Sequence, residues 1–174
     1  GNTVVASGGT LDLNGFNITS AENLSISGAG AGGVGALANS NTSTAVWSNN
    51  LTLSGAATVS GNSGNITLSG SITGGGNVLT LGGATGGTVS SVLNTTVASL
   101  VKDGAGTWAL SGANTYTGGT TLNAGKLRLD HASVNATNIP ATSNSAPRRA
   151  EGNTTSAAAQ LTSSHGKKMA TGFT

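Results

Sequence analysis

One short phrase recurs between Leu11 and Asp130 of this 174-residue chain. It consists of an apolar residue, any residue, a second apolar residue, a small or polar residue, and glycine. Its copies start at Leu11, Leu24, Leu51, Ile66, Leu79 and Trp108, with a last copy that lacks the glycine at Leu127. The steps between these starts are uneven, and weaker candidates at Leu37 and Leu93 lie in the two longest gaps. Recurrence of this kind indicates a repeat architecture rather than one compact domain.

Each copy of the phrase predicts a short strand. In one copy, alternation places Leu51 and Leu53 on one face and Thr52 on the other, and the glycine that follows permits a turn. Such a strand is too short to be stable alone, but it can pair with the equivalent strand of the next repeat. The sequence therefore predicts an all-β fold, a right-handed parallel β-helix (β-solenoid) over residues 1–130. Two phrases per coil give about 27 residues per coil and on the order of five coils.

The composition argues against an ordinary enzyme domain. The chain has 29 glycines, no cysteine, 7% charged residues and 3% aromatic residues. A typical globular domain has about 25% charged residues, so the usual supply of catalytic acids and bases is missing. The chain has no run of eighteen apolar residues and no signal segment at its start. Because it begins within the repeat at Gly1, we expect it to be a piece of a longer protein.

The sequence changes character after Asp130. Residues 1–130 have four acidic and three basic residues, whereas residues 131–174 have four basic residues, one acidic residue and both prolines. The apolar phrase also stops there, so residues 131–174 are expected to be a disordered tail, or a non-native one produced by a shift of reading frame near Ser145. Its basic residues are dispersed and lack aromatic neighbours, so we expect no nucleic-acid partner.

The segment from Leu100 to Asp130 carries the most specific pattern, LVKDGAGTWALSGANTYTGGTTLNAGKLRLD. It resembles the autotransporter-associated β-strand repeat of the passenger regions of bacterial type V secreted proteins. The matching positions are Leu100, Lys102, Gly104, Gly106, Thr107, Trp108, Leu110, Gly112, Asn114, Thr115, Tyr116, Gly118, Thr120, Leu122, Gly125 and Leu127. Residues 66–81 are similar to the strand-and-glycine segment that commonly precedes such a repeat. Residues 1–65 resemble it only in general sequence character.

The resemblance implies a parallel β-helix displayed outside a Gram-negative cell and followed by an outer-membrane barrel, which this chain lacks. It places four apolar side chains in the coil interior: Trp108, Leu110, Leu127 and Leu129. Three polar side chains are expected at a corner, where they bond to backbone groups or to neighbouring coils: Asn114, Thr115 and Thr117. Gly118 and Gly119 would form the turn before a strand from Thr120 to Leu122. The ring of Tyr116 would pack at the corner with its hydroxyl in water.

Two kinds of cofactor or metal site are not expected. Residues 28–33 satisfy the G-x-G-x-x-G pattern of dinucleotide sites, but no helical pattern follows and no acid occurs between Glu22 and Asp103. His131 and His165 are far apart in a chain without cysteine, so a closed metal site is poorly supported.

An enzyme acting on polysaccharides is the alternative class. Glycoside hydrolysis usually needs two carboxyl groups about 5 to 9 Å apart. The acids of residues 1–130 form two pairs that the fold could bring together, Asp12 with Glu22 and Asp103 with Asp130. No cluster of basic and aromatic residues accompanies either pair, so we expect no catalytic residues and no enzymatic activity.

The sequence thus predicts a non-catalytic stalk in the passenger of an autotransporter, exposed at the bacterial cell surface and anchored to the outer membrane through the missing barrel. A contribution to adhesion would involve a host-cell, matrix or glycan surface as partner. The alternative is a secreted β-helical protein that binds or degrades polysaccharides. With unpaired coil ends, the isolated chain is expected to self-associate or to be marginally stable.

Overall fold

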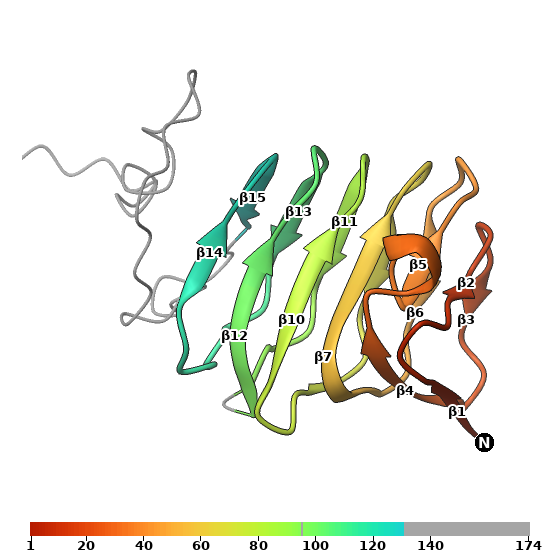
Figure 1. Cartoon of the computed structure of the whole chain (residues 1–174), viewed down its shortest axis with the longest axis horizontal. Coiled ribbons are helices and arrows are strands. Elements are labelled where there is room, and N and C mark those ends of the chain that lie inside the picture. The colour runs from red at the N-terminus through yellow and green to blue at the C-terminus, as the bar shows by residue number, and fades with distance from the viewer. Residues whose placement is uncertain (95, 131–174) are drawn as a thin grey trace, which may run out of the picture.

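The computed structural model describes residues 1–94 and 96–130, and it shows an all-β solenoid (Figure 1). The one helical element in the described part is η1, a 3₁₀ turn over Ala31–Gly33. The strands are β1 (Asn2–Val5), β2 (Leu11–Asp12), β3 (Asn17–Ile18), β4 (Asn23–Gly28), β5 (Leu37–Asn39), β6 (Ala45–Trp47), β7 (Leu51–Gly61), β8 (Ile66–Leu68), β9 (Ile72–Thr73), β10 (Asn77–Gly82), β11 (Gly86–Val89), β12 (Val97–Lys102), β13 (Thr107–Leu110), β14 (Thr120–Leu122) and β15 (Lys126–Leu129).

Two sheets form the walls of the solenoid. The first has the order β1-β4-β7-β10-β12-β14, with β2, β5 and β9 paired beside this path. The second has the order β15-β13-β11-β8-β6-β3. The strand pairings within both sheets are parallel, because each coil adds one strand to the same edge of each sheet. The resulting stack has about six turns and confirms the predicted parallel β-solenoid (Figure 1).

Most coils have fewer residues than the spacing of the apolar phrase predicted. Trp47, Leu68, Val89 and Leu110 occupy equivalent positions on successive strands of the second sheet. One coil therefore takes about 21 residues, at the short end of the range for solenoid repeats. The expected length of about 27 residues fits the coil that joins β4 to β7 but is too long for most of the others. Copies of the apolar phrase occur in both sheets. The number of residues between two successive copies therefore often measures the distance from one sheet to the other and not the length of a coil.

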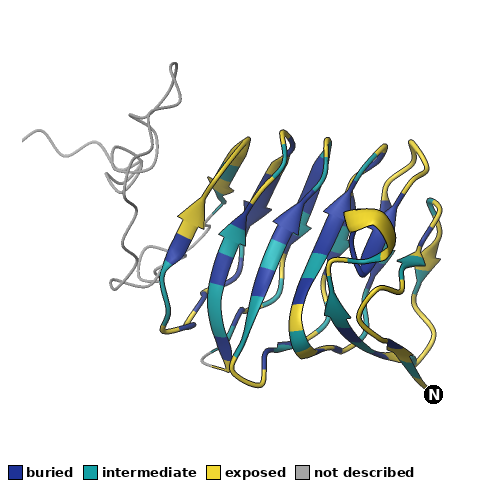
Figure 2. Ribbon diagram, in the orientation of Figure 1, coloured by how far each residue is buried: buried dark blue, intermediate teal, exposed yellow. Residues whose placement is uncertain are grey.

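Strand alternation builds the core as predicted. In β7, Leu51 and Leu53 are buried and Thr52 is exposed. Figure 2 shows buried residues running through successive strands of the stack. Full burial of one aliphatic side chain contributes about 1.5 to 3 kcal/mol, so a row with one such residue per coil stabilises each coil against the next.

The two weaker copies of the phrase also lie in the wall of the solenoid. Leu37 begins β5 and is fully buried. Leu93 is fully buried as well and forms an isolated parallel bridge with Ile72. The tail predicted for residues 131–174, with its two histidines, lies outside the described residues.

One corner of the solenoid is a ladder of glycines, Gly61, Gly83, Gly104 and Gly125. The last three have φ angles of 95°, 70° and 67°, a region that residues with a Cβ atom rarely adopt. A Cβ atom on Gly104 would lie 2.6 Å from the carbonyl oxygen of Gly83, and one on Gly125 would lie 2.4 Å from that of Gly104. Close stacking of the backbone therefore requires glycine at this corner in the coils of Gly83, Gly104 and Gly125.

Candidate functional site

The acids at the N-terminal end of the solenoid are both held by hydrogen bonds. The Asp12 carboxylate accepts bonds from the amides of Asn14 and Ser40, at 2.9 and 3.0 Å, and from the Ser40 hydroxyl. Burial raises the pKa of Asp12, but these bonds outweigh it and the net pKa is lowered. Glu22 accepts a 2.6 Å bond from the Thr3 hydroxyl, which is the main cause of its lowered pKa.

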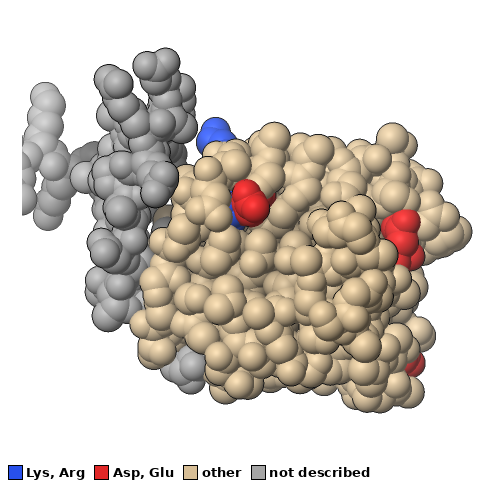
Figure 3. All heavy atoms as spheres, in the orientation of Figure 1, with Lys and Arg blue, Asp and Glu red and all other residues tan. Residues whose placement is uncertain are grey.

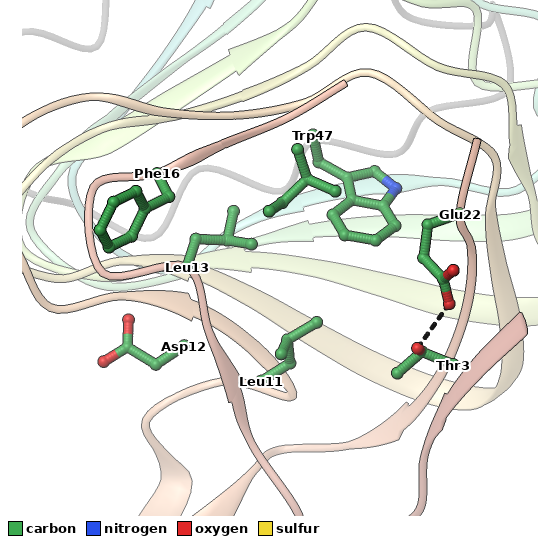
Figure 4. Close-up of a pocket in the computed structure, with 8 residues that line it drawn as sticks. Thr3, Leu11, Asp12, Leu13, Phe16, Glu22 and Trp47 are labelled. Atoms are coloured by element: carbon green, nitrogen blue, oxygen red, sulfur yellow. Dashed lines mark hydrogen bonds between the residues drawn. The ribbon is translucent and has the colours of Figure 1, made fainter. Parts of the chain in front are cut away.

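Asp12 and Glu22 line one cavity of about 330 Å³. The cavity is otherwise lined mainly by apolar side chains, Leu11, Leu13, Phe16, Ile18 and Trp47. Figure 4 shows the two carboxylates on opposite sides of this apolar group, with Glu22 turned towards Thr3. A glycosidase acid needs a raised pKa so that it can donate a proton, and both of these carboxyl groups have lowered ones.

The second pair of acids does not share a cavity. Asp103 accepts a 2.8 Å bond from the Gly104 amide and lines a hollow of about 320 Å³ with Thr58, Ser60 and Thr80. Asp130 is not among the residues that line this hollow; it pairs with Arg128 after the last strand. The structure thus brings together the first predicted pair of acids around a cavity, but not the second.

Charged side chains are sparse on the solenoid. Figure 3 shows one face that is nearly all uncharged, with isolated acidic and basic groups. Within residues 1–94 and 96–130, no group of three histidine, cysteine or acidic side chains is placed to hold a metal ion. The same residues contain no helix that is long and apolar enough to cross a membrane.

The glycine-rich run over residues 28–33 does not have the geometry of a dinucleotide site. It follows β4 and passes into η1, which is only three residues long. A pyrophosphate site of this type uses the N-terminus of an α-helix, and none follows in the described part of the chain.

The segment 100–130 closes the described solenoid and contains the second half of β12 together with β13, β14 and β15. Trp108 and Leu110 are fully buried, as predicted, and the Trp108 Nε1 donates a 2.8 Å hydrogen bond to the carbonyl of Gly82 in the preceding coil. Leu127 and Leu129 are only partly buried but pack against the same core. The predicted strand at Thr120–Leu122 is confirmed as β14.

The corner before β14 differs in one respect from the expectation. Asn114 is buried, and its Oδ1 accepts a 2.9 Å bond from the Leu93 amide of the neighbouring coil, as a corner residue should. Thr115 and Thr117 are exposed. Tyr116, however, is fully buried, and its hydroxyl lies 2.5 Å from that of Thr120. The prediction that its hydroxyl lies in water was wrong, and burial raises its pKa.

Sequence reasoning missed the burial of Lys102. Successive strands place it in one inward-facing row with Leu37, Val59, Leu81 and Leu122. Its Nζ donates hydrogen bonds to the carbonyls of Asp103, Gly104 and Ala124, at 2.7, 2.8 and 3.1 Å. Burial lowers the pKa of this lysine, although the charge of Asp103 opposes the effect. The signal was present, because Leu100 to Gly104 has the spacing of the phrase with lysine at the second apolar position.

Comparison with known proteins identifies this same segment. Residues 100–129 match the family model of the passenger-associated-transport-repeat. No curated protein and no solved structure gives a significant match to the chain. The match confirms the resemblance seen in the sequence, and a secreted, surface-exposed protein is what such a repeat suggests. The β-solenoid and its matched segment fit a passenger domain of an autotransporter.

Proposed function

We propose that this chain is a non-catalytic stalk within the passenger of a bacterial autotransporter. A membrane-embedded barrel elsewhere in the parent protein would anchor it to the outer membrane, and the stack of coils would hold a distal region away from the cell. The observation that carries this proposal is the family match over residues 100–129, which runs from within β12 through β13 and β14 to the end of β15.

The contacts of this segment support a structural role, because its buried polar groups link one coil to the next. Asn114 bonds to the coil before it through Leu93, and Trp108 does so through Gly82. Lys102 reaches forward to Ala124 in the coil that follows. A solenoid in which each coil contacts only its neighbours gains stability coil by coil.

Such a chain can fold while it is being exported. Each coil that has folded outside the cell offers a sheet edge on which the next coil forms, and this opposes backward movement of the chain. Most contacts join positions about 20 to 30 residues apart, so a coil can close soon after its residues emerge.

The stalk would also contribute to surface contact, with a host-cell, matrix or glycan surface as partner. One outward-facing row consists of Thr58, Thr80, Val101 and Thr121, and its three threonines offer hydroxyl groups for weak hydrogen bonds with such a surface. Binding of the purified chain to cells, matrix proteins and glycans tests this part of the proposal, and no binding to any of them would leave a purely structural stalk.

Surface display tests the stalk itself. The chain is placed between an N-terminal epitope tag and an outer-membrane translocator, and antibody labelling of intact cells measures display. Leu110→Pro removes a fully buried side chain and interrupts β13 in the interior of its sheet, so we expect it to reduce display. Thr52→Ala, at an exposed position, should display like the unmodified chain. Equal display of both variants, at equal cellular levels, would contradict templated folding.

The expectation that the chain is not an enzyme has its own test. Asp12, Glu22, Asp103 and Asp130 are replaced together by asparagine, and both proteins are screened for hydrolysis of polysaccharides. We expect no turnover by either protein. Turnover by the unmodified chain that disappears in the variant would favour a polysaccharide-degrading enzyme instead.

A further inference from the structure

A polar hollow lies on the outer face of the first sheet, in the middle of the stack. It is the hollow of about 320 Å³ that Asp103 lines, and its other residues come from the ends of β7 and β10, the turns near them, and the loop that carries η1. The order of the sheet places β4 and β14 on either side of β7, β10 and β12, so the hollow belongs to interior coils. Its volume is at the small end of the range for small-molecule sites, about 300 to 1,000 Å³.

A missing side chain at Gly82 opens the hollow. Gly82 pairs with Ser60 of the neighbouring strand. Asp103 directly follows Lys102, the partner of Leu81, and therefore comes next in the same outward-facing row. A Cβ atom on Gly82 would lie 3.1 Å from the Ser60 Oγ, so even an alanine would narrow this space. The row thus places a hydroxyl and a carboxylate on either side of bare backbone.

The η1 loop lines the hollow as well and is fixed to the sheet. The Asn62 Nδ2 donates a 3.0 Å hydrogen bond to the carbonyl of Val34, which directly follows η1. Gly35 packs against β7, because a Cβ atom on it would lie 3.0 Å from the Ser60 Oγ. In Figure 1 the coiled ribbon of η1 stands beside β7. The loop therefore shields Ser60 from solvent.

Ser60 is buried without a hydrogen-bond partner. The residue is 3% exposed, and within residues 1–94 and 96–130 its hydroxyl makes no hydrogen bond. The hydroxyls of Thr58 and Thr80 line the same hollow and have no partner among the described residues either. Buried hydroxyl groups of native proteins are nearly always hydrogen-bonded, so an unpaired one that lines a hollow points to a partner from outside the fold.

Charge and size select the class of ligand. Among the described residues that line the hollow, Asp103 alone is charged. Lys102 faces inward, and three backbone carbonyls bind its ammonium group. The Asp103 carboxylate therefore disfavours an anion. A bare metal ion is too small, because the hollow has about ten times the volume of one water molecule, about 30 Å³.

An uncharged sugar fits this combination. Its hydroxyl groups both donate and accept, so they can donate to the carboxylate of Asp103 and pair in either sense with the hydroxyls of Ser60, Thr58 and Thr80. Hydrogen bonds to the charged acceptor are the strongest of these.

We propose that this hollow binds one uncharged sugar unit of a glycan, with the Asp103 carboxylate and the Ser60 hydroxyl as its main hydrogen-bond partners. The inference rests on the proposed surface contact, for which it names a site and a ligand class, and it does not involve the stalk. One small site of this kind binds weakly, with a dissociation constant on the order of 1 mM, and many displayed copies strengthen contact with a glycan surface.

Nuclear magnetic resonance of the full ¹⁵N-labelled chain tests the proposal, with the amide signals of Gly82, Gly83 and Gly104 as reporters of the hollow. The probes are the methyl glycosides of glucose, galactose, mannose and N-acetylglucosamine. Glucuronic acid and N-acetylneuraminic acid are the charged counterparts, and calcium chloride is the cation probe.

Two variants remove one partner each. Ser60→Ala deletes a hydroxyl that has no partner within the described part of the fold, so it should not lower stability. Asp103→Asn removes the charge but keeps an acceptor for the Gly104 amide. Ser99→Ala is the matched control, since Ser99 is a half-buried serine of β12 that does not line the hollow. A thermal melt establishes that each variant is folded.

We expect the uncharged glycosides to shift the reporter amides saturably, and the charged sugars to bind more weakly. Ser60→Ala should weaken binding about fivefold and Asp103→Asn about tenfold, whereas Ser99→Ala should leave it unchanged. The absence of a saturable shift with every uncharged glycoside, at concentrations far above the expected dissociation constant, overturns the proposal. So does sugar binding that both variants retain, or a hollow that responds to calcium chloride and to no sugar.

Failure of this inference is distinguishable from failure of the proposed function. Loss of sugar binding leaves the display experiment with Leu110→Pro untouched. Binding to cells or glycans that persists in Ser60→Ala and Asp103→Asn would keep the surface contact and overturn the hollow as its site. Sugar binding in solution without binding to any cell, matrix or glycan surface would refute the surface contact and support the hollow.

Discussion

A charged side chain occupies an interior position at Lys102, where the equivalent residues of neighbouring strands are leucine or valine. The position is tolerated because the ammonium group finds three backbone carbonyls at the corner of the solenoid. Two of these belong to the same turn and the third, that of Ala124, belongs to the next coil. The side chain thus joins two coils while its stem fills the row, an arrangement that an exposed lysine cannot provide.

Lys102→Met tests this role. Methionine has a similar length and keeps the row apolar, but it leaves the carbonyls without their charged donor. We expect unfolding by urea to require about 2 kcal/mol less free energy than in the unmodified chain, the range for hydrogen bonds to a charged group. Lys126→Met, at an exposed lysine, should change it by less than about 0.5 kcal/mol. A methionine variant as stable as the original would show that the row prefers an apolar residue.

Tyr116→Phe removes the buried hydroxyl that contacts Thr120, and we expect a loss of about 1 kcal/mol at neutral pH. The pKa of Tyr116 is raised above its ordinary value of 10.0 in the folded state. The unfolded chain therefore releases this proton first, so the stabilisation is complete below pH 10 and declines as the pH rises through the folded-state pKa. The stability difference between the two proteins, measured by urea unfolding at pH 7 to 11, should shrink above pH 10. A difference independent of pH would contradict burial of the phenol.

At the scale of the single element, the corner glycines set how closely successive coils approach. Gly83, Gly104 and Gly125 recur at even spacing, once in each coil. This spacing is a better guide to the coil than the apolar phrase, because the glycines mark one corner whereas the phrase occurs on both sheets. Strand type, alternation and parallel stacking could be predicted from side-chain pattern alone. The coil length could not be read from that pattern, since Leu51 and Ile66 look alike but lie in different sheets.

Gly104→Ala should destabilise the solenoid by two separable effects. The φ angle of 70° costs a residue with a Cβ atom about 1 to 2 kcal/mol, and the added Cβ would also meet the Gly83 carbonyl at 2.6 Å. Gly76→Ala isolates the first effect, because its φ is 81° but nothing lies within 4 Å of the added atom. Thermal and urea unfolding should therefore show a larger loss for Gly104→Ala. Equal losses would mean that the coils can separate at this corner without cost.

The whole molecule is a set of rows that run through the stack, and this explains which site residues the sequence could identify. Trp108 and Leu110 were predicted to be interior because they follow the alternation within their own strand. The ammonium group of Lys102 depends in part on the next coil, which supplies the Ala124 carbonyl, and the burial of Tyr116 does not follow from any alternation in its own segment. The sequence offered two possible pairs among four scattered acids. Whether the members of a pair line the same cavity depends on how turns that are far apart in the chain are placed, which the sequence pattern does not determine.

If the coil is the unit of stability, adding one in register should stabilise the chain. Duplicating residues 69–89 inserts one further coil after Val89 and continues each row with a residue that already fits it, Leu79, Leu81 and Val89 among them. The inserted coil buries its own apolar side chains and forms one interface with the coil before it and one with the coil after it. These two interfaces take the place of the single interface between those neighbours. We therefore expect the midpoint of thermal unfolding to rise by about 3 °C or more. An insert of equal length and composition in scrambled order is the control: it cannot continue the rows, forms a loop, and should lower the midpoint through its closure entropy. Circular dichroism melts of the three proteins decide the question, and an in-register duplication no more stable than the scrambled one would show that the coils are not interchangeable units.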